Sequence, residues 1–208
     1  MDIRKKRIKA SAKDYVSVNY QDCLAKLATQ VEHGDALENP LVVPFILTCA
    51  AALEAKLNDE IISWAWDTFD REDYKRIAVA YLSMNLRGKL DSLVPLISKN
   101  LYAFDKSSKD YQALTQLISQ RNSLVHDKSF YEEVTIEIER DEGIVGLEDA
   151  RIRFPDGHLE SLMKSPYRTA NAKECQQYYK AIKALDEKFL YLIEKGELKD
   201  NDMIKRVK

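Results

Sequence analysis

The apolar residues of this chain recur at intervals of three and four positions over most of its length, and no other feature limits the fold as much. Because an α-helix turns once every 3.6 residues, this spacing gathers apolar side chains on one face, which must be buried. The first stretch carries it at Val16, Tyr20, Leu24, Leu27 and Val31. Glycine and proline, with 6 and 5 occurrences in 208 residues, rarely interrupt the pattern. We therefore predict a mainly α-helical protein.

The same spacing, together with capping signals, divides the chain into successive helices. The segments that carry the pattern are about 13–33, 39–69, 72–98, 107–127 and 171–196. We expect Gly88 and Pro95 to bend or divide the third of them. The fourth should begin at Ser107 or Ser108, and Asn171 should cap the last one.

The period of the apolar residues changes from helix-like to two between the fourth and the last of these helices. Val134, Ile136 and Ile138 alternate with polar residues, and a second alternation follows at 151–154. Side chains of a strand point to opposite faces in turn, so this pattern is typical of β-structure. We predict a β-hairpin inserted at about 132–155.

Length and charge favour one domain without a general affinity for nucleic acid. A chain of 208 residues that is 45% hydrophobic can form one core, so we expect a single domain over 1–208 with the hairpin as its insertion. The charged segments 1–10 and 197–208 are expected to be flexible ends. The net charge of -2 gives no global positive field, so any contact with RNA must be local.

Cysteine usage and hydropathy indicate a cytoplasmic protein that does not enter a membrane. The three cysteines are widely spaced and odd in number, which favours neither a disulfide framework nor a metal site. The most apolar run, 41–53, is well short of the roughly 20 residues that span a bilayer. We expect no metal and no cofactor.

One group of residues, at the end of the fourth helix, suggests chemistry. Residues 121–126 read Arg-Asn-Ser-Leu-Val-His. At about 100° per residue, Arg121 falls on the same apolar stripe as Leu117 and Ile118, so its charge should point to a core or an interface. Asn122 and His126 are four positions apart, so the amide could fix the orientation of the imidazole.

A purely structural interpretation of these residues is also open. Arg121 could pair with a buried acid, and His126 could simply interact well with the C-terminal end of a helix dipole. Glu54 is the candidate acid, because it lies on the apolar stripe of the second helix and a buried carboxylate needs a partner. We predict an ion pair between Glu54 and Arg121, in a supporting role that fits either interpretation.

The Arg-Asn-x3-His arrangement near a helix end resembles the signature of the HEPN superfamily. The resemblance implies an up-and-down helical bundle and an endoribonuclease that acts as a homodimer, often as a toxin in toxin–antitoxin or phage-defence systems. It also allows a catalytically inactive scaffold that binds RNA or protein. The inserted hairpin departs from the common pattern. Some family toxins carry a tyrosine, modified by the antitoxin, two residues after the histidine, where this chain has Lys128.

The chemistry that the resemblance implies needs no metal. The RNA 2′-hydroxyl attacks the neighbouring phosphorus and leaves a 2′,3′-cyclic phosphate, which requires proton transfer and stabilisation of charge on the phosphoryl oxygens. His126 would exchange protons, Arg121 would bind the phosphate, and Asn122 would orient His126 or bind a phosphate oxygen. Since the motif holds one histidine, we expect a composite site in a homodimer, with RNA as substrate and an antitoxin protein as a possible further partner.

Overall fold

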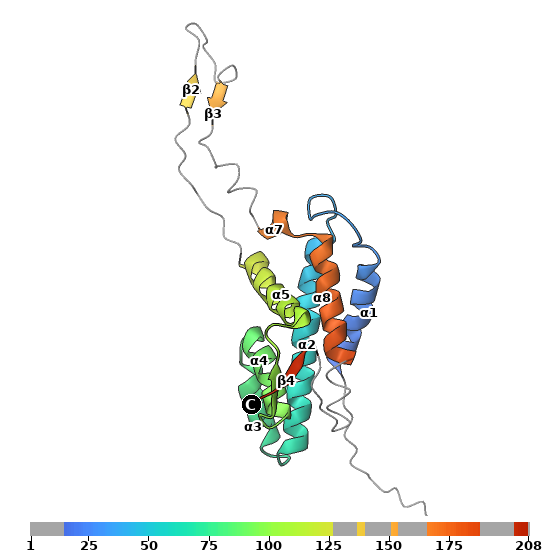
Figure 1. The fold of residues 1–208 in the computed structure, drawn as a ribbon, viewed down its shortest axis with the longest axis vertical. Helices are drawn as coiled ribbons and strands as arrows, with labels where there is room; N and C mark the ends of the chain where they lie inside the picture. The colour runs from blue at the N-terminus through green and yellow to red at the C-terminus, as the bar shows by residue number, and fades with distance from the viewer. Residues whose placement is uncertain (1–14, 127–136, 140–150, 154–165, 188–201, 208) are drawn as a thin grey trace, which may run out of the picture.

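The computed structural model describes residues 15–126, 137–139, 151–153, 166–187 and 202–207 (Figure 1). Most of these residues are helical, which confirms the prediction of a mainly α-helical protein. The elements in chain order are α1 (Val16–Ala28), α2 (Val42–Thr68), α3 (Tyr74–Leu82), α4 (Leu86–Ile97), β1 (Tyr102–Phe104), α5 (Lys109–Val125), β2 (Glu137–Glu139), β3 (Arg151–Arg153), α7 (Pro166–Thr169), α8 (Ala172–Leu185) and β4 (Ile204–Arg206).

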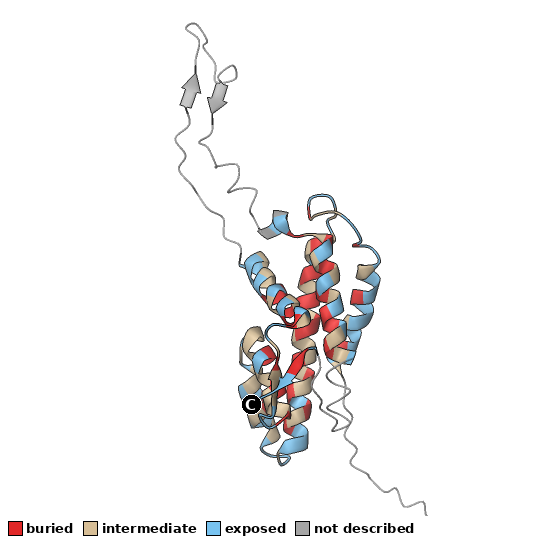
Figure 2. Ribbon diagram, viewed as in Figure 1, coloured by how far each residue is buried: buried red, intermediate tan, exposed pale blue. Residues whose placement is uncertain are grey.

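Helix α2 is the central element of the fold. Its neighbours are α1, α8, α3, α4 and α5, and Figure 1 shows α1 and α8 beside one part of it and α3 and α4 beside the other. The fully buried side chains of α2 include Phe45, Ile46, Leu53, Leu57 and Ile61. Burial of each stabilises the fold by about 1.5–3 kcal/mol relative to an exposed position. Figure 2 shows that buried residues line α2 and α8 for much of their length.

The third predicted helix is divided, but not where we expected. The break lies between α3 and α4, where Asn85 adopts an extended conformation and caps α4 by accepting a hydrogen bond from the Gly88 amide at 2.7 Å. Gly88 therefore lies in the first turn of α4. Pro95 lies in its last turn, near the point where Lys99 and Asn100 take positive φ angles and the chain leaves the helix.

A short sheet near the end of the chain corrects the expectation of a flexible end at 197–208. Strand β4 pairs antiparallel with β1, and Ile204 lies opposite Phe104. Met203 and Ile204 are fully buried. These two apolar residues, set among charged ones, hold residues 202–207 on the core, while residues 1–10, 197–201 and 208 lie outside the described residues.

The predicted hairpin is present where the structure describes it. Strands β2 and β3 pair antiparallel, with Ile138 opposite Ile152, as the period of two indicated. The other residues of 132–155 lie outside the described residues.

The last helix, α8, begins as predicted. The Asn171 side chain caps it by accepting a hydrogen bond from the Glu174 amide at 3.1 Å. The described part of the helix runs to Leu185, and the stretch from 188 to 196 lies outside the described residues.

Within the described ranges, none of the helices combines the length and the apolar character needed to cross a bilayer.

Candidate functional site

Helix α5 carries the predicted motif, and its own sequence fixes where it begins. Ser108 is the N-cap, and its hydroxyl accepts a hydrogen bond from the Tyr111 amide at 3.2 Å. Ser107, the other start that we considered, uses its hydroxyl to donate to the Asp105 carboxylate. Leu114 and Leu117 are fully buried, so the apolar stripe packs α5 against the core as the periodicity predicted.

Polar contacts to α8 anchor the two turns of α5 that precede the motif. The Tyr178 hydroxyl donates a hydrogen bond to Gln120 Oε1 at 2.7 Å. The Gln116 and Gln120 amides both donate to the Glu174 carboxylate, at 3.2 and 2.9 Å. The Tyr178 residue is fully buried, and this burial raises the pKa of its hydroxyl, so Tyr178 stays a donor at neutral pH. These contacts fix the position of the helix just before Arg121.

The motif itself lies at the C-terminal end of α5. The Arg121 side chain is half-buried, and its Nη1 donates a hydrogen bond to Asn122 Oδ1 at 2.9 Å. His126 is the C-cap; its backbone amide donates to the Asn122 carbonyl at 3.0 Å, and its side chain is exposed. The Asn122 oxygen that we expected to orient His126 therefore accepts from Arg121 instead.

The apolar stripe of α5 is not fully covered at this end. Leu124 is half-buried and Val125 is 50% exposed, whereas Leu114 and Leu117 on the same helix are fully buried. The motif thus combines an accessible imidazole, an oriented guanidinium and an exposed apolar residue.

The predicted ion pair between Glu54 and Arg121 is wrong. Glu54 Oε1 instead accepts a hydrogen bond from Lys89 Nζ at 3.0 Å. The Lys89 side chain is only 4% exposed and that of Glu54 is 40% exposed, so the carboxylate is needed to compensate a buried cation. The reason is the packing of α4 against α2, which brings Lys89 next to Glu54 in place of the expected Arg121.

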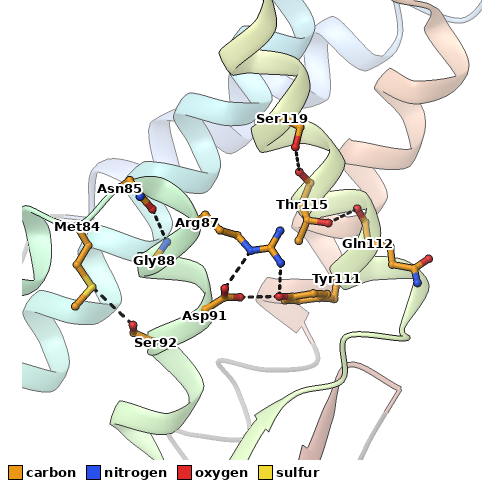
Figure 3. Close-up of polar contacts among 10 residues, drawn as sticks. All are labelled: Met84, Asn85, Arg87, Gly88, Asp91, Ser92, Tyr111, Gln112, Thr115 and Ser119. Carbon is orange, nitrogen blue, oxygen red and sulfur yellow. Dashed lines mark hydrogen bonds and ion pairs between the residues drawn. The ribbon is translucent and has the colours of Figure 1, made fainter.

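A second polar cluster, which the sequence analysis missed, joins α4 to α5 (Figure 3). Arg87 Nε donates to Asp91 Oδ2 at 3.1 Å, and Arg87 Nη2 donates to the Tyr111 hydroxyl at 2.7 Å. That hydroxyl donates to Asp91 Oδ1 at 2.6 Å, which completes a hydrogen-bond network of three side chains. The guanidinium carbon also lies 5.1 Å from the centroid of the Tyr111 ring, within cation–π range.

The electrostatics of this cluster keep Arg87 positively charged and the Tyr111 hydroxyl protonated at neutral pH. Partial burial lowers the pKa of Arg87, but the hydrogen bonds and charge interactions with Asp91 and Tyr111 together outweigh it, and the net shift is upward. Burial and the Asp91 carboxylate raise the pKa of the Tyr111 hydroxyl. The spacing of Arg87 and Asp91, four positions apart on one helix, was the available sequence signal.

The part of the chain that the structure describes contains no group of three or more histidine, cysteine, aspartate or glutamate residues placed to hold a metal ion. His33 is exposed, and His158 lies outside the described residues.

Comparison of the chain with models of known protein families, with curated proteins and with solved structures gives no match.

Proposed function

We propose that the chain is a metal-independent endoribonuclease whose site consists of Arg121, Asn122 and His126. The observation that carries the proposal is the exposure of the His126 side chain at the end of α5. An imidazole buried against its own core could not reach a substrate. Here it is accessible to a substrate, about one and a half helical turns from a guanidinium that Asn122 orients.

The residue types suit transesterification within RNA. A base takes the proton of the 2′-hydroxyl, the 2′-oxygen forms a bond to phosphorus, and the bond from phosphorus to the 5′-oxygen breaks as that oxygen receives a proton. The products are a 2′,3′-cyclic phosphate and a free 5′-hydroxyl. Histidine can serve as the base or the acid near neutral pH. Arg121 supplies a planar cation for the phosphoryl oxygens, and Asn122 is its positioning residue.

Two proton-transfer groups are needed, and a second copy of the chain would supply the second. Val125 is 50% exposed next to His126, and a twofold contact through this end of α5 would cover it and bring two copies of His126 together. The site would then be composite, with one histidine as base and the other as acid. In a cell, such an enzyme fits the role of a toxin or phage-defence effector that an antitoxin protein restrains.

The same exposed Val125 favours a second candidate function from a different class. A helical module that binds a partner protein or RNA without cutting it would also present an apolar residue beside polar ones. The two functions differ in whether His126 and Arg121 are needed for a chemical step.

The test is incubation of the purified protein with transfer RNA and total RNA in excess EDTA. We expect cleavage that leaves cyclic phosphate ends, with the rate lowered by about 10²- to 10⁴-fold in His126→Ala, the usual contribution of a general acid or base. His33→Ala is the matched control, because His33 is also exposed but lies in the connection between α1 and α2, far from α5 in sequence. Arg121→Ala should be impaired as well.

Equal activity of wild type, His126→Ala and His33→Ala would contradict the proposal and favour the binding module. Growth arrest on expression, relieved by His126→Ala, would support the toxin role.

A further inference from the structure

The guanidinium of Arg87 is held in place on one edge and open on the other. Asp91 and Tyr111 engage its Nε and Nη2 atoms, and the Tyr111 ring lies beneath it. An arginine has five N–H donors, and these contacts use two of them among the described residues. In Figure 3, the remaining terminal nitrogen points away from Asp91, toward the Thr115 side of α5. The Arg87 side chain is 43% exposed, so this edge can reach a ligand.

An arginine fixed in this way is suited to bind a phosphate. The planar fork matches phosphate oxygens, and its orientation is already set in the folded chain, so little conformational entropy is lost on binding. Asp91 occupies the Nε edge and acts as a positioning residue. A phosphate would approach from the opposite edge.

The position of Arg87 relates it to the proposed nuclease site. At about 100° per residue, Thr115, Asn122 and His126 fall within roughly 60° of Tyr111 around α5, and Ser119 falls within roughly 80°. The face of α5 that meets Arg87 is therefore the face that carries Asn122 and His126. Along the more exposed side of this face the intervening side chains are small hydroxyls, since Thr115 is half-buried and Ser119 is exposed, while Ile118 beside them is buried in the core.

The separation of the two sites suggests how many nucleotides a strand would need to span them. At 1.5 Å per residue, Tyr111 lies about 15 Å along the helix axis from Arg121 and about 22 Å from His126. With a rise of about 3.4 Å per nucleotide in a stacked strand, this corresponds to roughly four to seven nucleotides. The gap is too long for one nucleotide and short enough for one continuous strand.

We propose that Arg87 binds a backbone phosphate of a single-stranded RNA substrate, several nucleotides from the bond that is cut, and that the Tyr111–His126 face of α5 is the track along which the strand lies. This proposal rests on the proposed nuclease function, whose substrate class it narrows to single-stranded stretches of at least about five nucleotides. Arg87 is a specificity-determining residue in it, and the hydrogen bonds from Asp91 and Tyr111 position its side chain.

The test measures RNA binding separately from cleavage. Fluorescence anisotropy with a labelled uridine decamer in EDTA, between 50 and 200 mM salt, gives the dependence of the binding constant on salt. The parent protein carries His126→Ala, so the RNA stays intact, and Arg87→Gln and Arg87→Lys are added to it. Arg76→Gln is the matched control, because Arg76 is an 80% exposed arginine on α3 that also pairs with an aspartate.

Each phosphate contact on a single strand contributes a slope of about -0.7 to log binding constant against log salt. Arg87→Gln should therefore flatten the slope by about 0.7 and weaken binding by about tenfold at low salt. Arg76→Gln should change neither quantity. Arg87→Lys, which keeps the charge, should keep the slope. Shortening the RNA to three nucleotides should weaken binding by the parent more than by Arg87→Gln, because the short RNA no longer reaches residue 87.

The outcomes separate this proposal from the nuclease function. If the wild type cleaves RNA but Arg87→Gln binds like Arg76→Gln, the track is overturned and the nuclease stands. If Arg87→Lys loses the slope as Arg87→Gln does, the network only holds α4 to α5, and the track is again overturned. RNA binding that depends on Arg87 in a protein that does not cleave supports the track and contradicts the nuclease. A wild type that neither cuts nor binds RNA overturns both.

Discussion

Replacement of Ile204 by alanine should lower the free energy of unfolding by about 2–5 kcal/mol. The Ile204 side chain is fully buried and lies opposite Phe104 in the β1–β4 sheet. The substitution removes three carbon atoms, worth about 2.4 kcal/mol at about 0.8 kcal/mol each, and the cavity left behind adds to this. Domains of this kind are stable by about 5–15 kcal/mol, so the loss is a large part of the total.

Urea unfolding followed by the fluorescence of Trp64 and Trp66 on α2 would measure the change. With a typical slope of about 2–3 kcal/mol per molar urea, the midpoint should fall by roughly 1–2 M. Val207→Ala is the matched control: Val207 is 51% exposed just beyond the same strand and should cost less than about 0.5 kcal/mol. If Ile204→Ala unfolds at the same midpoint as Val207→Ala, strand β4 does not complete the core.

Three further results are expected. Hydrogen bonds from Lys205 and then Ser107 hold the pKa of Asp105 at about 2, so its stabilising contact is complete above the unfolded value of about 4 and is lost as pH falls through about 2. Thermal unfolding should therefore show the wild type losing its advantage over Asp105→Asn between pH 4 and 2, and a constant difference would contradict this. Ser108→Ala removes the α5 cap and should cost about 1 kcal/mol in urea. Tyr178→Phe leaves Gln120 Oε1 without its donor and should also cost about 1 kcal/mol; an unchanged midpoint would mean that water replaces the hydroxyl.

The parts of the fold that depend on neighbouring residues could be predicted from the sequence. The cap at Asn171, the start of α5 at Ser107 or Ser108, and the extended segments that contain Ile138 and Ile152 follow from side-chain chemistry or periodicity within a few positions. A break in the third helix was predicted correctly, but its position was wrong. Gly88 and Pro95 are strong helix-breaking signals, whereas the break lies at Asn85, which caps α4. A glycine in the first turn costs a helix little, whereas Pro95 removes one backbone hydrogen bond from α4 close to the point where the helix ends.

The parts that depend on which elements meet could not be predicted. Nothing in the local pattern shows that Lys89 reaches Glu54, since this requires the packing of α4 on α2. The strands of the β1–β4 sheet are three residues long and about a hundred positions apart, too short for a visible alternation.

The same division applies to the candidate site. The position of Arg121 and His126 at a helix end follows from periodicity. The contact of Arg87 with Tyr111 crosses between two helices and appears only in three dimensions.

The pairing of β4 with β1 also has a consequence for the order in which the protein can mature during synthesis. Residues 102–104 leave the ribosome about a hundred positions before their partners at 204–206. Until those partners emerge, Phe104 lacks its facing strand, and β1, which packs against α4, lacks its hydrogen-bonded partner. Contacts this distant in sequence form late and slowly. In a nascent chain, helix α5 would therefore pack before β1 has its partner strand. The site on α5 would reach its final order only after Ile204 has been synthesised.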